Sequence, residues 1–326
     1  MSVKDSEDIL AATQPDAVDV DALGESVASL SVAYLSARSA PPTPMLNQGL
    51  QLRHEAVRRI KEGAARPHEL KDLYLAAGRA FGVLSYAALD LGEPEAAKTH
   101  ARAAWRLADL ANDDEQRAWV RGTESLIARF QKDYRFAATL IQDGLKYAGP
   151  GTSTVRLLCG AAQCAANNAD SETAQRLLDE ALTARDESTL DTVNGLFAFS
   201  YAKQLYYGGS SLMWLTDEAA LRRAEHDSAE AITLWAHEGE QFRSLADEAL
   251  AHVYMATARL KLGEIEGAMA AMRPIIEIPA DRQIKISWMR KRVTELVLLL
   301  DDERFEHSTV AADAREELQA ASSSSQ

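Results

Sequence analysis

The chain has 326 residues, of which 47% are hydrophobic and 6% aromatic, and its formal net charge is −14. That length exceeds what a single hydrophobic core usually supports, so two domains or an elongated repeat array is expected. The negative charge argues against a protein whose whole surface meets DNA or anionic lipid, because binding to phosphates requires a basic surface.

Three features of the sequence indicate the cellular compartment of the protein: its N-terminus, its apolar runs and its cysteines. Residues 1–20 are acidic and lack a basic segment leading into an apolar run, so we expect a disordered N-terminus and no secretory signal. The longest apolar run, residues 293–300, is too short to span a bilayer. Cys159 and Cys164 are five positions apart in a predicted helix and therefore on different faces, so no disulfide or metal site between them is expected. These features predict a cytoplasmic protein without membrane association.

Helical patterns begin in residues 21–66, which we expect to form N-terminal helices, and continue as helical hairpins. In the first hairpin, residues 67–110, apolar residues recur every three or four positions up to Leu91. This is the period of a half-buried helix. Gly92 ends that helix and Pro94 lies in the first turn of the next one, where its missing amide donor costs nothing.

The same layout returns along the rest of the chain. Small residues open the second helix of each hairpin at Ala97, Ala137, Ala174, Ala229 and Ala268, and successive positions differ by 40, 37, 55 and 39 residues. A period near 40 residues with two helices per period is typical of an α-solenoid. The long interval contains "YYGGSS", which we interpret as part of a lengthened loop in the fourth hairpin, and "GPGTS" is interpreted as a connector. The predicted hairpins span residues 67–110, 113–148, 151–185, 190–238 and 240–279, followed by a capping helix over 280–307 and a flexible tail over 308–326.

Several of these segments resemble tetratricopeptide repeats, namely those around Phe81, Gly92 and Ala97, around Ala174 and Leu178, and around Gly263 and Ala268. The resemblance implies an all-α fold, a right-handed α-solenoid of about five such hairpins with an N-terminal helix and a C-terminal capping helix. The alanine-rich residues 50–300 are also similar to the repeat region of actinobacterial regulators that carry a helix-turn-helix domain before their repeats. Residues 1–45 show no such domain, so the resemblance implies a sensor or adaptor module, and direct nucleic-acid binding is not expected.

In a solenoid the first helix of each hairpin lines the inner, concave surface, so polar or aromatic residues there are candidates for ligand binding. Asparagine and glutamine can hold the backbone of an extended peptide, and arginine can hold a carboxylate through two hydrogen bonds. The leading hypothesis is a non-enzymatic regulatory protein that binds a peptide or protein segment in this groove; for each residue, an ordinary solvated position is the alternative. The candidates are Arg79, Tyr86, Arg129, Arg156, Gln163, Asn167, Asn194, Tyr201 and Gln204.

The alternative hypothesis is a small-molecule sensor or an unusual enzyme. The aromatic residues of 197–207 have mixed spacings, so we expect some in the core and one or two lining a pocket near residues 194–214. No histidine pair has zinc-binding spacing, and the acidic cluster at residues 301–307 is interpreted as the solvated end of a helix. No catalytic residue, metal or cofactor is predicted.

A basic segment, residues 282–292, stands out in this acidic chain. It either coats the capping helix, the favoured interpretation, or contacts an acidic surface of a partner or, as the less favoured alternative, nucleic acid. A homodimer through the last helix is a further hypothesis. The basic side chains are Arg282, Lys285, Arg290, Lys291 and Arg292.

Overall fold

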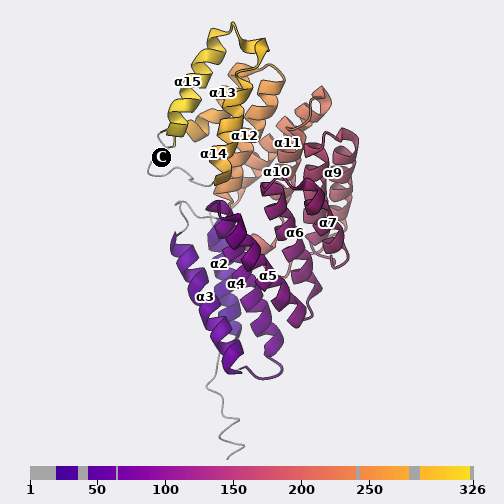
Figure 1. Cartoon of the computed structure of the whole chain (residues 1–326). Coiled ribbons are helices and arrows are strands. Elements are labelled where there is room, and N and C mark those ends of the chain that lie inside the picture. Colours follow the sequence, from indigo (N-terminus) through magenta and orange to yellow (C-terminus); the bar gives the residue numbers. More distant parts are fainter. Residues whose placement is uncertain (1–19, 36–42, 64, 240–242, 279–286, 324–326) are drawn as a thin grey trace, which may run out of the picture.

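The computed structural model describes residues 20–35, 43–63, 65–239, 243–278 and 287–323, and helices are the only regular structure within these ranges (Figure 1). The predicted all-α class is confirmed. The predicted disordered N-terminus, residues 1–20, lies almost wholly outside the described residues. None of the described helices combines the length and the apolar character needed to cross a membrane.

Two helices, α2 (Val20–Leu35) and α3 (Thr43–Glu62), come first. Apolar residues of α2 recur every three or four positions, and Leu23, Val27 and Leu30 are buried. Both helices pack against each other and against α4, the next helix in the chain. They therefore cover one side of α4.

Ten further helices follow, from α4 to α13, and consecutive helices of this series pack against each other (Figure 1). We call α4, α6, α8, α10 and α12 the first helices, because each is followed by a helix that packs on it. The first helices also pack on one another in chain order. Their bounds and those of their partners are α4 Leu70–Asp90, α5 Pro94–Leu110, α6 Asp114–Phe130, α7 Tyr134–Leu145, α8 Ser153–Asn167, α9 Ser171–Asp186, α10 Tyr201–Leu212, α11 Glu218–His237, α12 Leu245–Lys261 and α13 Ile265–Ile276.

Several turns between these helices share one backbone conformation. Gly92 and Gly263 have φ angles of 82° and 86°, in the left-handed region that glycine adopts without strain. Lys132 and Ala169 occupy the equivalent positions with φ angles of 62° and 60°. The following residue begins the next helix; Asp133, for example, accepts a hydrogen bond from the Phe136 amide at 3.0 Å. A sharp turn followed by a capped helix thus recurs along the chain.

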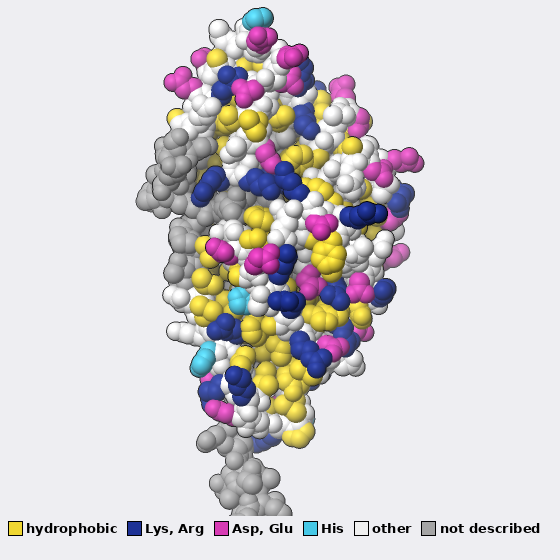
Figure 2. Space-filling model, in the orientation of Figure 1, with side chains coloured by type: hydrophobic (Ala, Val, Ile, Leu, Met, Phe, Trp, Pro, Cys, Tyr) yellow, Lys and Arg dark blue, Asp and Glu magenta, His cyan; other side chains and the backbone are white. Residues whose placement is uncertain are grey.

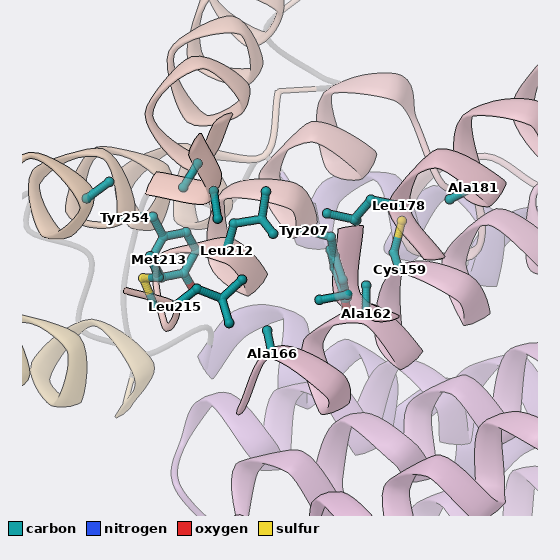
Figure 3. Close-up of a cluster of buried hydrophobic side chains, with 14 of the residues drawn as sticks. Cys159, Ala162, Ala166, Leu178, Ala181, Tyr207, Leu212, Met213, Leu215 and Tyr254 are labelled. Atoms are coloured by element: carbon teal, nitrogen blue, oxygen red, sulfur yellow. The ribbon is translucent and has the colours of Figure 1, made fainter. Parts of the chain in front are cut away.

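Small side chains pack where paired helices cross. Of the five alanines aligned from the sequence, Ala97, Ala137, Ala174 and Ala268 are at most 1% exposed. The alignment was wrong at Ala229, which lies in the middle of α11, and Leu221 takes the corresponding place in the first turn. The largest apolar cluster joins residues of α8, α9, α10, α11 and α12 (Figure 3).

The prediction of a long loop at "YYGGSS" was wrong, because these residues continue α10. Gly208 and Gly209 face α11. A Cβ added to Gly208 would stand 3.1 Å from Asp227 Cγ, and one added to Gly209 would stand 3.3 Å from Ser228 Cβ. Glycine lets the two helices approach closely here. The extra residues lie instead between α9 and α10, in residues 187–200, which we call the strap; it contains a short 3-10 helix, η1 (Gly195–Phe197).

The C-terminal part contains α14 (Ser287–Leu299), a 3-10 turn η2 (Glu303–Phe305) and α15 (Thr309–Ser323). The prediction of a flexible tail over residues 308–326 was wrong for α15, which packs against α13 and α14. Its buried residues Ala311, Ala314 and Leu318 lie three or four positions apart and give the helix an apolar face. The helix α14 contacts both α12 and α4. It therefore connects the two ends of the series of first helices.

Candidate ligand-binding site

Arg156 extends from α8 into the interior and donates hydrogen bonds to two neighbouring first helices. Its Nη1 donates to the carbonyl oxygen of Trp119 at 2.6 Å, and its Nη2 donates to the hydroxyl groups of Tyr86 at 2.8 Å and Thr123 at 3.0 Å. The guanidinium carbon lies 5.0 Å from the centre of the Trp119 ring, a cation–π distance. Arg156 therefore links α8 to α6 and α4.

Arg129 enters the same region from the end of α6. Its Nη1 donates a hydrogen bond to Oε1 of Gln163, whose Nε2 donates to the hydroxyl group of Ser210 at 2.8 Å. Its guanidinium carbon lies 5.5 Å from the ring centre of Tyr207, which reaches from α10 toward α8 (Figure 3). Arg129, Gln163 and Ser210 therefore join α6, α8 and α10 through a chain of hydrogen bonds.

The two arginines belong to one group of side chains, because Tyr86 and Tyr207 each interact electrostatically with Arg129 and with Arg156. Four members of this group were candidates from the sequence. Tyr207 belongs to the aromatic run that was expected to contribute to a pocket, whereas Ser210 was not predicted. We call the group the interior cluster; it comprises Tyr86, Arg129, Arg156, Gln163, Tyr207 and Ser210.

Glycines in the facing helices make room for the two guanidinium groups. A Cβ on Gly122 of α6 would stand 2.7 Å from Arg156 Nη1, and a Cβ on Gly160 of α8 would stand 3.5 Å from Arg129 Nη2. Glycine inside a helix costs about 0.5–1 kcal/mol relative to alanine, so its presence signals a close approach. The sequence carried this signal, but it did not say which side chain approaches.

The interior cluster holds two positive charges away from water. Four charged side chains are buried among the described residues: Arg129 (5% exposed), Arg156 (7% exposed), Asp227 and Glu248. Each acid has an arginine within ion-pair distance; Arg243 contacts Glu248 at 2.6 Å and Arg223 contacts Asp227 at 3.8 Å. Neither Arg129 nor Arg156 has a carboxylate within 4.0 Å among the described residues. On the surface, acidic and basic side chains are interspersed over the face shown in Figure 2.

The polar neighbours of the two arginines do not supply the missing negative charge. Burial raises the pKa of the Tyr207 phenol, although Arg129 acts to lower it, and burial also raises the pKa of the Cys164 thiol. Both groups are therefore neutral near pH 7, whereas a guanidinium group stays protonated in proteins. Burying an unpaired ion is unfavourable by several kcal/mol. The Nε of Arg129 is buried and has no hydrogen-bond partner among the described residues.

Two other candidates, Asn167 and Gln204, are used inside the protein but outside this cluster. The Asn167 side chain donates to the carbonyl oxygen of Gln163 at 2.8 Å, one turn earlier in its own helix. Gln204 is buried, and its Oε1 accepts a hydrogen bond from Arg185 Nε at 2.9 Å. The side-chain amides of Asn167 and Gln163 and the Oε1 of Gln204 thus have intramolecular partners, whereas the buried Nε2 of Gln204 has none among the described residues.

The remaining candidates, Arg79, Asn194 and Tyr201, lie elsewhere. Burial lowers the pKa of Arg79, while the charges of Asp113 and Glu115 act to raise it. Asn194 is exposed, and Tyr201 is 40% exposed. The structure therefore does not bring these three side chains to the interior cluster.

The strap packs against Trp119, which contacts Arg156 of the interior cluster. Trp119 Nε1 donates a hydrogen bond to the carbonyl oxygen of Leu196 at 3.2 Å, and the rings of Trp119 and Phe197 are 4.7 Å apart. The same Trp119 contacts Arg156 through its ring and its carbonyl group. The strap therefore covers the aromatic residue against which Arg156 packs.

Two side chains of the described part of the basic segment, Lys291 and Arg292, pack against aromatic rings of the protein. The Lys291 amine lies 5.3 Å from the ring centre of Phe130, and the Arg292 guanidinium carbon lies 4.7 Å from that of Trp214. Arg292 also pairs with Glu295 at 2.5 Å, whereas Arg290 is exposed. Arg282 and Lys285 lie outside the described residues. The basic residues of α14 thus take part in packing against aromatic rings.

A second polar pair, Tyr34 and Asp90, was not anticipated from the sequence. The Tyr34 hydroxyl group donates a hydrogen bond to the Asp90 carboxyl group, from α2 to the end of α4. Burial raises the pKa of Asp90 to about 7; the hydrogen bond from Tyr34 and the charge of Lys203 lower it, and Asp247 raises it. The two residues are 56 positions apart, so no local pattern could have paired them.

The acidic cluster at residues 301–307 is engaged in ion pairs. Asp302 pairs with Arg304 at 3.0 Å, and Asp301 pairs with Arg315 of α15 at 3.0 Å. No group of three histidine, cysteine or acidic residues suited to a metal ion occurs among the described residues.

The sequence was also compared with known proteins. No protein-family model matches the chain, and no curated protein sequence matches it significantly. The interior cluster is therefore interpreted from its own geometry and charge.

Proposed function

We propose that the helices form a right-handed α-solenoid of five tetratricopeptide-like hairpins, with α14 as a cap. The order of contacts supports this proposal, because α4, α6, α8, α10 and α12 pack on one another in chain order and each carries a partner helix. The recurring left-handed turn before the second helix, at Gly92, Lys132, Ala169 and Gly263, gives further support.

We propose that the protein is a non-enzymatic sensor in a regulatory circuit, which responds to a small ligand enclosed by its first helices. The observation that carries this proposal is the interior cluster. Side chains from α4, α6, α8 and α10 converge on two arginines that are 5% and 7% exposed. Convergent polar groups among aromatic rings are typical of small-molecule sites. The resemblance of the repeats to those of actinobacterial regulators supports a regulatory role.

A peptide or protein segment is the second candidate ligand. The exposed side chains of Asn194 and Tyr201, at the junction of the strap and α10, favour it. An extended peptide could contact both without entering the interior. The buried arginines are less suited to this role, because an open groove would leave them accessible to water.

Thermal unfolding of the full chain with a panel of small metabolites tests the sensor proposal. A compound that binds only the folded state raises the melting temperature. We expect such a compound to stabilise the wild type and the Arg121→Gln variant but not Arg129→Gln. Arg121 is a matched control, because it is an arginine of the same helix that pairs with Glu124 and Asp143, both at 2.6 Å.

The second candidate has its own test. A synthetic peptide library is screened for binding to the wild type and to an Asn194→Ala, Tyr201→Ala double variant. If no small compound stabilises the protein, and a peptide binds the wild type but not the double variant, the peptide proposal replaces the sensor proposal.

A further inference from the structure

We infer that the interior cluster binds an oxyanion, a carboxylate or phosphate group of the ligand. This inference rests on the proposed function and names the chemistry of its ligand. Buried charges in folded proteins are normally paired, as Asp227 and Glu248 are here. The two buried arginines lack such a partner among the described residues. A bound anion supplies the opposite charge.

The hydrogen-bonding groups of the cluster point to the same chemistry. Arg129 Nε has no partner among the described residues. The Tyr86 oxygen accepts a hydrogen bond from Arg156, which leaves the hydroxyl proton of Tyr86 to donate. Tyr207, kept neutral by burial, also carries a hydroxyl proton. The cluster therefore offers more donors than acceptors, and carboxylate and phosphate oxygens are strong acceptors.

The surroundings strengthen an interaction with an anion. The rings of Trp119 and Tyr207 lie 5.0 and 5.5 Å from the two guanidinium carbons, and the strap covers Trp119. Excluding water lowers the local dielectric constant and makes charge-assisted hydrogen bonds stronger. Elsewhere, the net charge of −14 disfavours anion binding. A tightly held anion is thus expected in the interior cluster.

Thermal unfolding at constant ionic strength tests the inference, with sodium chloride replaced stepwise by sodium phosphate or sodium acetate. We expect at least one of the two anions to raise the melting temperature of the wild type by about 2 °C or more. The rise should be smaller in Arg129→Gln and Arg156→Gln than in the wild type and Arg121→Gln. Phosphate also stabilises all proteins by exclusion from their surface, so the rise due to binding is the excess in the wild type and Arg121→Gln over the two arginine variants of the cluster.

Equilibrium dialysis with radiolabelled phosphate and acetate covers the case in which the arginine variants do not fold. The wild type should bind about one anion per chain, and the anion that binds identifies the group. Binding of neither anion, or undiminished stabilisation by the anion in Arg129→Gln, overturns the inference.

The oxyanion inference and the sensor proposal can fail separately. If an uncharged metabolite stabilises the protein through Arg129 and neither anion binds, the sensor proposal stands and the oxyanion inference is wrong. If phosphate or acetate binds at the arginines and no metabolite stabilises the protein, the anion site stands and the sensor proposal is wrong.

Discussion

Gly208 of α10 lies directly against Asp227 of α11, and a Cβ on Gly208 would stand 3.1 Å from the carboxyl carbon of Asp227. The carboxyl group is buried and has Arg223 as its ion-pair partner at 3.8 Å. Burial raises the pKa of Asp227 to about 6, and Arg223 counteracts this shift. Close helix packing and the position of a buried acid are thus coupled at this crossing.

Gly208→Ala should therefore lower the free energy of unfolding by about 1–3 kcal/mol, the range for overpacking a well-packed interior. Urea denaturation measures this difference. Gly24→Ala is the matched control, because Gly24 lies within α2 and its Cβ would meet nothing within 4 Å. The control should be neutral or stabilising. Equal stability of the two variants would contradict the close crossing.

The dependence of stability on pH should change in Asp90→Asn. The pKa of Asp90 is raised by burial to about 7 from an ordinary value of 3.8, so between these values the folded chain holds a proton that the unfolded chain has released. Its contribution to stability is then greatest at low pH and falls as pH rises toward 7, by at most about 1.4 kcal/mol per pH unit.

Chemical denaturation between pH 5 and 7 tests this prediction. Wild-type stability should fall more steeply with rising pH than the stability of Asp90→Asn, which has no proton to lose at this position. Asp227 titrates in both proteins, so its effect cancels in the comparison. Equal slopes would show that Asp90 does not titrate in this range.

Substitutions in the turns should have opposite effects at two equivalent positions. Lys132→Gly should stabilise the protein by about 0.5–1 kcal/mol, because glycine relieves the strain of a left-handed residue at φ 62°. Gly263→Ala should destabilise it by about 1 kcal/mol for the converse reason. A Cβ on Gly263 would meet nothing within 4 Å, so only the backbone is tested. Thermal denaturation and urea denaturation should both show that Lys132→Gly stabilises the protein and that Gly263→Ala destabilises it. If both substitutions changed the stability in the same direction, the result would be inconsistent with a shared turn.

Asp191→Ala should release the strap. The Asp191 carboxylate accepts hydrogen bonds from the Thr152 amide at 2.8 Å, the Thr152 hydroxyl group at 2.6 Å and the Phe199 amide at 3.3 Å. We expect a loss of about 1–3 kcal/mol, because buried donors lose their partner. Limited proteolysis should cut residues 187–200 faster than in the wild type. Thr192→Ala, which removes only an exposed contact to Glu115, should leave the cutting rate unchanged.

The sequence predicted the features that local patterns determine. The apolar period, the turn at Gly92 and the buried Ala97 all follow from residues a few positions apart. The same reasoning failed at "YYGGSS", because glycine pairs usually interrupt a helix, whereas here they let α10 approach α11. The position of α15 was also missed, since its apolar face is made largely of alanine.

For the candidate site, the sequence indicated residue types but not their surroundings. Arg129, Arg156 and Gln163 were selected as polar positions on first helices, and the structure brings them together. Their burial could not be predicted, because it depends on α10 and on the strap, which lie far along the chain. The contact between Trp119 and Leu196, for example, joins residues 77 positions apart.

The strap also affects how the chain folds and unfolds. In a stack of hairpins that touch only their neighbours, each end can unravel independently of the other. Here the Ser31 hydroxyl group donates to the carbonyl oxygen of Asn194 at 3.0 Å, across 163 positions of sequence. Closing so long a loop requires the intervening helices to be in place. The helices α2 to α9 and the strap should therefore lose their structure in one cooperative step, with the strap contacts among the last to form during refolding.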